Sequence, residues 1–293
     1  MKIGLSLSGS GVRAAAHIGV LKVFKKHGIP IDLISGTSAA SLVAALYATG
    51  YSAADMEDIF LSYQNSPRAI KKLIDPDYLA YISFLLSGLF KKQPSIDGFI
   101  KGNNYQNLID TLIHTHGHNM ISDSLIPLAI PAVDLETAKI IMFVSDKTML
   151  FDDTDIAYHD DISYSKAVRA SSSFPAIFKP VLHECHRLVD GGIRENLPID
   201  VLREMGADVI IGVNAGYYGE YTSTVSDITR IASRVLDIMN YSITENFAET
   251  SDILICPEVH DIETFQFNKI THCIKCGEDV AENSIDLLKS IVK

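Results

Sequence analysis

The sequence predicts an α/β fold with a mainly parallel sheet, because strand and helix patterns alternate along the first third of the chain. Residues 3–7 are an apolar run typical of a buried strand, and residues 13–27 then show the spacing of an amphipathic helix. A second apolar run over residues 32–35 leads into an Ala/Leu-rich helical segment over residues 39–49. Because neighbouring parallel strands need a crossover of this kind, the two units predict parallel strands lying side by side.

The later elements follow from the same patterns. Residues 65–120 interrupt the alternation, and they contain an apolar stretch over residues 78–90. We interpret this stretch first as a packed core helix and second as part of an acyl-binding lip and membrane-facing cap. Further strands are expected over residues 126–133, 139–144 and 208–214, and further helices over residues 164–170, 199–205, 226–247 and 269–291.

The composition is that of an ordinary globular chain, with 47% hydrophobic and 21% charged residues among 293. The formal net charge of −11 argues against a nucleic-acid partner, and any lipid contact must be local and largely apolar. No signal-peptide pattern precedes the first predicted strand, and residues 78–90 fall short of the ~20 residues of a membrane-spanning helix. We therefore expect a cytoplasmic protein, or an exported effector without a cleaved signal, that contacts membranes peripherally.

The cysteines and histidines do not predict a metal site. Cys273 and Cys276 have zinc-like spacing, but no second cysteine pair accompanies them. His272 and the run His-Glu-Cys-His over residues 183–186 would have to complete such a site. The three histidines within residues 114–118 are more typical of a polar loop. We interpret the four cysteines of the chain as reduced thiols.

Ser38 is the leading candidate for a nucleophile. It lies among small residues at a predicted strand-to-helix turn, Gly-Thr-Ser-Ala-Ala over residues 36–40. Such a sharp corner exposes the serine Oγ, and the following helix points its positive end at that oxygen. The arrangement predicts a serine acyl hydrolase. A serine turn that only caps a helix is the alternative, because the pattern is Gly-x-Ser-x-Ala rather than Gly-x-Ser-x-Gly.

The loop formed by Gly9, Ser10 and Gly11 is the candidate oxyanion hole. An acyl-transfer serine needs donors for the developing oxyanion, and successive backbone N–H groups at a strand–helix junction can supply them. Residues 9–14 also fit the Gly-x-Gly-x-x-Gly/Ala dinucleotide fingerprint, so nucleotide binding is a competing hypothesis. That fingerprint requires an acid at the end of the second strand, whereas Asp32 stands at its start.

Asp190 is the candidate general base. It follows the apolar residues 188–189 and precedes two glycines, a pattern that places a carboxylate on a tight turn but also describes a plain turn. A free aspartate, with a pKa of ~3.9, is a poor base, so Asp190 needs a desolvated site and a hydrogen bond to Ser38. His260 and His272 are the only histidines that follow it, and neither lies in a turn-like setting. We therefore predict a Ser–Asp dyad rather than a triad.

Taken together, these segments resemble the patatin-like phospholipase family. The family's motifs are a Gly-Gly-Gly-x-Arg/Lys-Gly loop, a Gly-x-Ser-x-Gly elbow and an Asp-Gly-Gly/Ala motif, in this order. The corresponding segments here are residues 9–14, 36–40 and 190–192, with similar flanking runs at residues 17–21, 170–175 and 193–198. Ordered agreement at three separate sites is far more specific than any one motif, and the resemblance covers roughly residues 1–215.

The resemblance implies a three-layer α/β/α sandwich with a mainly parallel central sheet. It implies a catalytic domain over residues 1–215, with a helical or cap insertion at about 65–120. Residues 216–293 would form a helical region packed on the same domain. The implied substrates are phospholipids, lysophospholipids or neutral lipids, and no cofactor or metal is implied for the chemistry.

The resemblance also implies roles for the candidate residues. Ser38 would form an acyl-enzyme, and Asp190 would accept its proton and later activate water. The amides of the loop from Gly9 to Gly11 would stabilise the oxyanion, at ~3 kcal/mol per donor. Arg13 would brace this loop or meet a phosphate group.

Three positions depart from the family pattern, because Ser10, Ala14 and Ala40 replace glycines. A side chain there is tolerable where φ is negative, whereas a positive φ at Ser10 would strain or misalign the hole. The alternative function is therefore a catalytically weak or inactive patatin-like lipid-binding protein. The sequence makes no prediction about head-group preference or oligomeric state.

Overall fold

A computed structural model describes the chain except for residues 91–96, 149, 217–227, 249 and 292–293, and the side chains of 85–90, 228–230, 232–233 and 246–248. Its described part contains a nine-stranded sheet in the order β5-β4-β3-β2-β1-β8-β9, with β7 paired to β3 and β6 to β7. Five of the strand pairs are parallel, so the predicted mainly parallel sheet is confirmed. The strands are β1 (Ile3–Leu7), β2 (Leu33–Gly36), β3 (Leu128–Asp134), β4 (Ile140–Val144), β5 (Ile156–His159), β6 (Val181–His183), β7 (His186–Asp190), β8 (Val209–Val213) and β9 (Ile253–Ile255).

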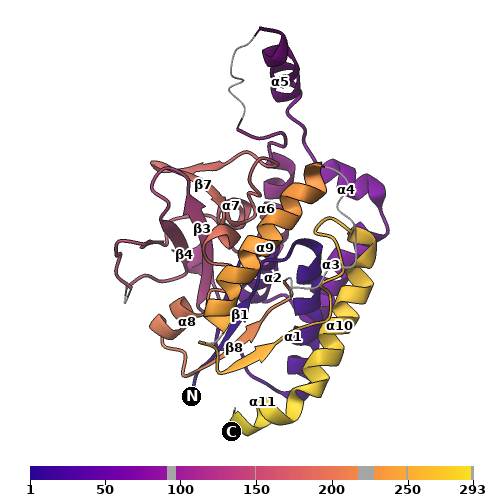
Figure 1. Ribbon diagram of the computed structural model, residues 1–293. Coiled ribbons are helices and arrows are strands. Elements are labelled where there is room, and N and C mark those ends of the chain that lie inside the picture. Colours follow the sequence, from indigo (N-terminus) through magenta and orange to yellow (C-terminus); the bar gives the residue numbers. More distant parts are fainter. Residues whose placement is uncertain (91–96, 149, 217–227, 249, 292–293) are drawn as a thin grey trace.

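Helices cover both faces of the sheet, as the predicted three-layer architecture requires (Figure 1). On one face, Leu5 of β1 belongs to the main core together with side chains of α1, α2 and α10. On the other face, a Cβ added to Gly4 would lie 3.2 Å from Leu202 of α8, so this helix packs directly on β1. The helices are α1 (Ala15–His27), α2 (Ala39–Ala48), α3 (Ala53–Gln64), α4 (Pro67–Leu73), α5 (Tyr78–Phe90), α6 (Asn103–Thr115), α7 (Tyr164–Ser171), α8 (Asp200–Glu204), α9 (Ile228–Ala248), α10 (Ile270–Asn283) and α11 (Ile285–Ile291).

Two glycines allow α1 and α10 to pack with their backbones in contact. A Cβ added to Gly19 would lie 2.0 Å from the carbonyl oxygen of Ile274, and one added to Gly277 would lie 1.9 Å from that of Ala16. No larger residue fits either position without moving a helix. The C-terminal α10 therefore lies directly against the first helix of the fold.

The structure corrects the favoured interpretation of residues 78–90. They are helical, but α5 stands away from the rest of the molecule (Figure 1). Tyr78 and Leu79 are 71% and 79% exposed, so α5 is not a packed core helix. None of the described helices is both long and apolar enough to cross a bilayer.

Other element predictions differ in detail from the structure. The single helix expected over residues 269–291 is two helices, α10 and α11, separated at Ser284. The helix expected over residues 226–247 corresponds to α9, although residues 226–227 lie outside the described part. The strands β5, β6 and β9, of three or four residues each, were not among the expected elements.

Candidate active site

The sheet topology explains why three distant segments meet. The loop after β1 and the turn after β2 lie at the carboxyl ends of adjacent parallel strands, so they share one edge of the sheet. Strand β3 pairs with β2 only through Leu128 and Ala129, and with the antiparallel β7 through its last three residues. Strand β7 therefore lies beside β3 just beyond the end of β2. It runs toward the turn and delivers Asp190 to Ser38.

Ser38 occupies a sharp strand-to-helix corner. Its φ of 53° and ψ of −128° are unusual for a residue with a side chain, and strain of this kind is common at functional sites. The Ser38 N–H donates a hydrogen bond to Ser171 Oγ at 2.9 Å, which holds the corner in place. A Cβ added to Gly36 would lie 2.7 Å from the carbonyl oxygen of Ala40, so only glycine lets α2 turn back this tightly.

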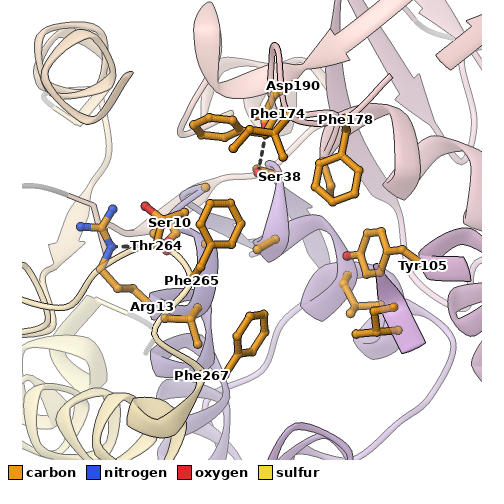
Figure 2. Close-up of a pocket in the computed structure, with 18 of the residues that line it drawn as sticks. Ser10, Arg13, Ser38, Tyr105, Phe174, Phe178, Asp190, Thr264, Phe265 and Phe267 are labelled. Carbon is orange, nitrogen blue, oxygen red and sulfur yellow. Dashed lines mark hydrogen bonds between the residues drawn. The ribbon is translucent and has the colours of Figure 1, made fainter. Parts of the chain in front are cut away.

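Ser38 Oγ donates a hydrogen bond to Asp190 Oδ2 at 2.6 Å, and Figure 2 shows the two side chains facing each other. The other oxygen, Oδ1, accepts from the Gly192 N–H at 2.9 Å. Asp190 is only 6% exposed, and burial raises its pKa to about 6 although both hydrogen bonds act in the opposite direction. The carboxylate is thus ionised at neutral pH and is a stronger base than a free aspartate.

The glycine loop is unstrained at the positions that depart from the family motif. Ser10 has a φ of −161° and Ala14 a φ of −56°, both of which any residue can adopt. Gly11 does require glycine, because its φ is +61° and an added Cβ would lie 2.4 Å from Thr264 Cγ2. Ala40 lies within α2, where alanine is favourable. Ser10 therefore lacks the backbone strain that a positive φ would cause.

The backbone donors of the loop are not equivalent. The Gly9 N–H donates to the carbonyl oxygen of Asn196 at 3.1 Å, so it is already engaged. Within the described part of the chain, no hydrogen bond uses the N–H of Ser10 or of Gly11. An added Cβ on Gly9 would lie 3.0 Å from Ser38 Cβ, so Gly9 serves the close approach of the loop to the serine. Of the three loop N–H groups, those of Ser10 and Gly11 are therefore the better candidates for oxyanion donors.

Arg13 and His17 hold the glycine loop in place through its carbonyl oxygens. The Arg13 side chain is 1% exposed, and its Nε donates to the Ser10 carbonyl oxygen at 3.1 Å. Its Nη2 donates to Asp237 Oδ1 of α9 at 2.7 Å. His17 Nε2 lies 2.9 Å from the Ser8 carbonyl oxygen, and burial lowers the His17 pKa to about 4, so the ring is a neutral donor. Of the two roles expected for Arg13, these contacts support bracing.

A largely apolar cavity of about 540 Å³ opens from the Ser38–Asp190 pair, a volume usual for small-molecule sites. The residues around it include Tyr105, Phe174 and Phe265 (Figure 2). Further walls come from α2, α3, α4, α6 and α9, including Leu42, Phe60, Leu73, Leu108, Leu112 and Leu236. Such a cavity can hold a hydrocarbon chain with one end at the serine.

Arg169 is a buried organising residue that the sequence analysis did not identify. Its guanidinium donates to the carbonyl oxygens of Lys101, Gly102 and Lys179 and to Ser173 Oγ. The Ser173 carbonyl oxygen in turn accepts the N–H of Asp190 at 3.1 Å. Because most of its partners are main-chain atoms from distant loops, no local motif reveals this network. Burial lowers the Arg169 pKa to about 10, which leaves it charged at neutral pH.

The competing site hypotheses find less support. Asp32 Oδ2 accepts the Ile3 N–H at 2.8 Å, at the opposite end of the strands from the glycine loop, so it cannot meet a ribose bound there. Neither His260 nor His272 lines the cavity around Ser38. Cys273 is buried in α10, and no cluster of potential metal ligands in the described part includes the Cys273–Cys276 pair.

Comparison with known proteins identifies the family of this chain. The model of the patatin-like phospholipase family matches residues 5–203. Lysophospholipase nte1 of Aspergillus fumigatus is 27% identical over 98% of this chain. The human patatin-like phospholipase domain-containing protein 6 is 27% identical over 74%. The chain spans only 18% and 14% of these two relatives. Among solved structures, VipD from Legionella pneumophila shares the fold, with a TM-score of 0.55 and 14% identity, over 99% of this chain and 67% of VipD.

Proposed function

Since the chain belongs to the patatin-like phospholipase family, we propose that it is a lipid acyl hydrolase acting on phospholipids or lysophospholipids. The observation that carries this proposal is the 2.6 Å hydrogen bond from Ser38 to Asp190 at the end of an apolar cavity. The cavity suits an acyl chain, the serine suits attack on an ester, and the buried carboxylate suits proton transfer.

Acylation follows from the positions of these groups. Asp190 takes the proton from Ser38 as Oγ attacks the ester carbonyl carbon. The N–H groups of Ser10 and Gly11 donate to the oxyanion, and the positive end of α2 favours the same charge. Asp190 then gives the proton to the leaving alcohol oxygen as the C–O bond breaks, which leaves the acyl group on Ser38.

Deacylation uses the same groups in reverse order. Asp190 accepts a proton from a water molecule, whose oxygen attacks the acyl carbon. The bond to Ser38 Oγ breaks, Oγ regains the proton, and the fatty acid leaves. Every proton in the cycle passes through Asp190, so no third side chain is required.

Fatty-acid release from lysophosphatidylcholine and turnover of a short p-nitrophenyl ester test the proposal. We expect Ser38→Ala to abolish both, and the exposed control Ser62→Ala on α3 to leave both unchanged. Equal activity of wild type and Ser38→Ala would refute the dyad. Liposome binding by wild type without any release would instead support the lipid-binding alternative.

The surface of α4 and α5 supports peripheral contact with an anionic bilayer. Among the residues of α5 whose side chains the structure describes, the exposed large apolar ones are Tyr78, Leu79, Tyr81, Ile82 and Phe84. Helix α4 exposes Arg68, Lys71 and Lys72. Its other side contributes Leu73 to the cavity. Apolar anchors on α5 and basic side chains on α4, the helix that precedes it in the chain, suit anionic lipid, despite the negative charge of the whole chain.

Co-sedimentation with vesicles containing anionic lipid tests this contact. Leu79→Glu/Ile82→Glu should lose vesicle binding, because both side chains are exposed on α5 and neither belongs to the dyad. Turnover of the water-soluble p-nitrophenyl ester should stay at the wild-type rate. Leu125→Glu, at a position 65% exposed outside α5, is the matched control. Wild-type vesicle binding by the double variant would contradict the proposed contact.

A further inference from the structure

A second cluster of chemically active side chains lies away from the Ser38–Asp190 pair. His159 is the last residue of β5. Glu184 lies in the turn between β6 and β7, and His186 is the first residue of β7. One potential ligand atom from each of the three lies within 4.8 Å of the other two. None of the three lines the catalytic cavity, and the proposed ester chemistry does not use them.

The distances between these three side chains are close to the distances between ligands of one metal ion. His159 Nδ1 lies 3.7 Å from Glu184 Oε2, and the imidazole centroids of His159 and His186 are 5.6 Å apart. Two N or O ligands of one tetrahedral zinc ion are about 3.3 Å apart, and two coordinated imidazoles have centroids about 5 Å apart, given bonds of about 2.0–2.1 Å. Small side-chain rotations would bring the observed groups to these separations.

Asp134 supplies the outer contact that ligating histidines commonly have. Its Oδ2 lies 3.2 Å from His186 Nδ1, which leaves His186 Nε2 as the nitrogen available to a metal. The Asp134 side chain is 2% exposed and accepts hydrogen bonds from Thr137 Oγ1 at 2.6 Å and from the Arg187 N–H at 3.1 Å. The carboxylate that orients His186 is therefore itself held in place.

We propose that His159, Glu184 and His186 bind a divalent cation of the zinc class. Two imidazoles and one carboxylate are typical zinc ligands, and a water molecule can complete four-coordination. Cys185, whose Sγ lies 3.8 Å from His186 Nε2, borders the fourth position. The cation joins the end of β5 to the β6–β7 turn. It holds the start of the strand whose last residue is Asp190, and it takes no part in ester cleavage.

Zinc binding by the purified full chain tests this proposal. After treatment with a chelator, the chain is titrated with Zn²⁺ alone against a chromophoric competitor. We expect one site per chain, and Glu184→Gln/His186→Asn should weaken its affinity at least about 100-fold. The control His118→Asn/Glu258→Gln also removes one histidine and one glutamate, and it should bind as wild type does. Zn²⁺ should raise the Tm of wild type but not that of the double variant.

Two further measurements keep the test decisive. Co²⁺ should give wild type the strong visible bands of a four-coordinate site, and circular dichroism should show that the variants remain folded. If the double variant does not fold, Glu184→Gln alone replaces it, because the Glu184 side chain is 57% exposed. The zinc affinity of this single variant should still fall about tenfold. Wild type without stoichiometric zinc, or variants that bind zinc as tightly as wild type, would overturn the proposal.

Discussion

Replacing Asp190 with asparagine should strongly reduce turnover and, at alkaline pH, stabilise the folded chain. Burial raises the Asp190 pKa from 3.8 to about 6, so the folded chain holds this proton more tightly than the unfolded chain does. The stability that the protonated Asp190 side chain contributes is fully present below about pH 4 and is lost as the pH rises through about 6. A shift of roughly two pKa units corresponds to about 3 kcal/mol, as an upper bound.

Asparagine removes this ionisation and keeps the shape of the side chain. Its Oδ1 can accept from the Gly192 N–H, and its Nδ2 can donate to Ser38 Oγ. At pH 8, Asp190→Asn should therefore unfold at a higher urea concentration than wild type, and the difference should vanish near pH 4. Turnover should fall by about 10²–10⁴-fold with the loss of the base. For wild type, kcat/KM should fall as the pH is lowered through about 6.

Urea titrations followed by circular dichroism at pH 4, 6 and 8 measure these differences. The exposed Asp58→Asn on α3 is the control, and it should show neither the stabilisation nor the loss of turnover. A variant less stable than wild type at pH 8, or a stability difference that does not change with pH, would refute the conclusion that burial raises the pKa of the Asp190 carboxyl.

Three further predictions concern the support of the site. Asp237→Asn should lower kcat and destabilise the chain by about 2 kcal/mol, because the buried Arg13 loses its ion pair; urea unfolding and ester turnover check this. Gly277→Ala should destabilise by about 1–3 kcal/mol, since α1 and α10 must separate, and a lower Tm is the readout; an unchanged Tm would contradict the close crossing. Arg169→Met should destabilise by more than about 2 kcal/mol, because Ser173 and three carbonyl oxygens lose their donor. A stable, fully active Arg169→Met would show that the network is dispensable.

The fold class was predictable because periodic patterns report local structure directly. Residues 3–7 and 33–36 are strands, and residues 15–27 and 39–48 are helices, close to the expected bounds. Helix α5 was misjudged because an apolar run resembles a core helix in sequence, whether or not another element covers it. Only the three-dimensional structure shows that this apolar run projects away from the rest of the molecule (Figure 1).

The candidate site was predictable to the level of the residues on its motifs. Ser38 and Asp190 lie on recognisable turns, and in the structure Ser38 Oγ is 2.6 Å from Asp190 Oδ2. The engagement of the Gly9 N–H by Asn196 could not be inferred, since it depends on the path of a loop far along the chain. The same holds for Asp237, which reaches Arg13 from α9 without any local signal.

Peptide mapping after reaction with a fluorophosphonate tests the central claim most directly. A single adduct on Ser38, formed slowly or not at all in Asp190→Asn, is the predicted result. Labelling at another residue, or equal labelling rates with and without the Asp190 carboxylate, would contradict a mechanism in which Asp190 activates Ser38.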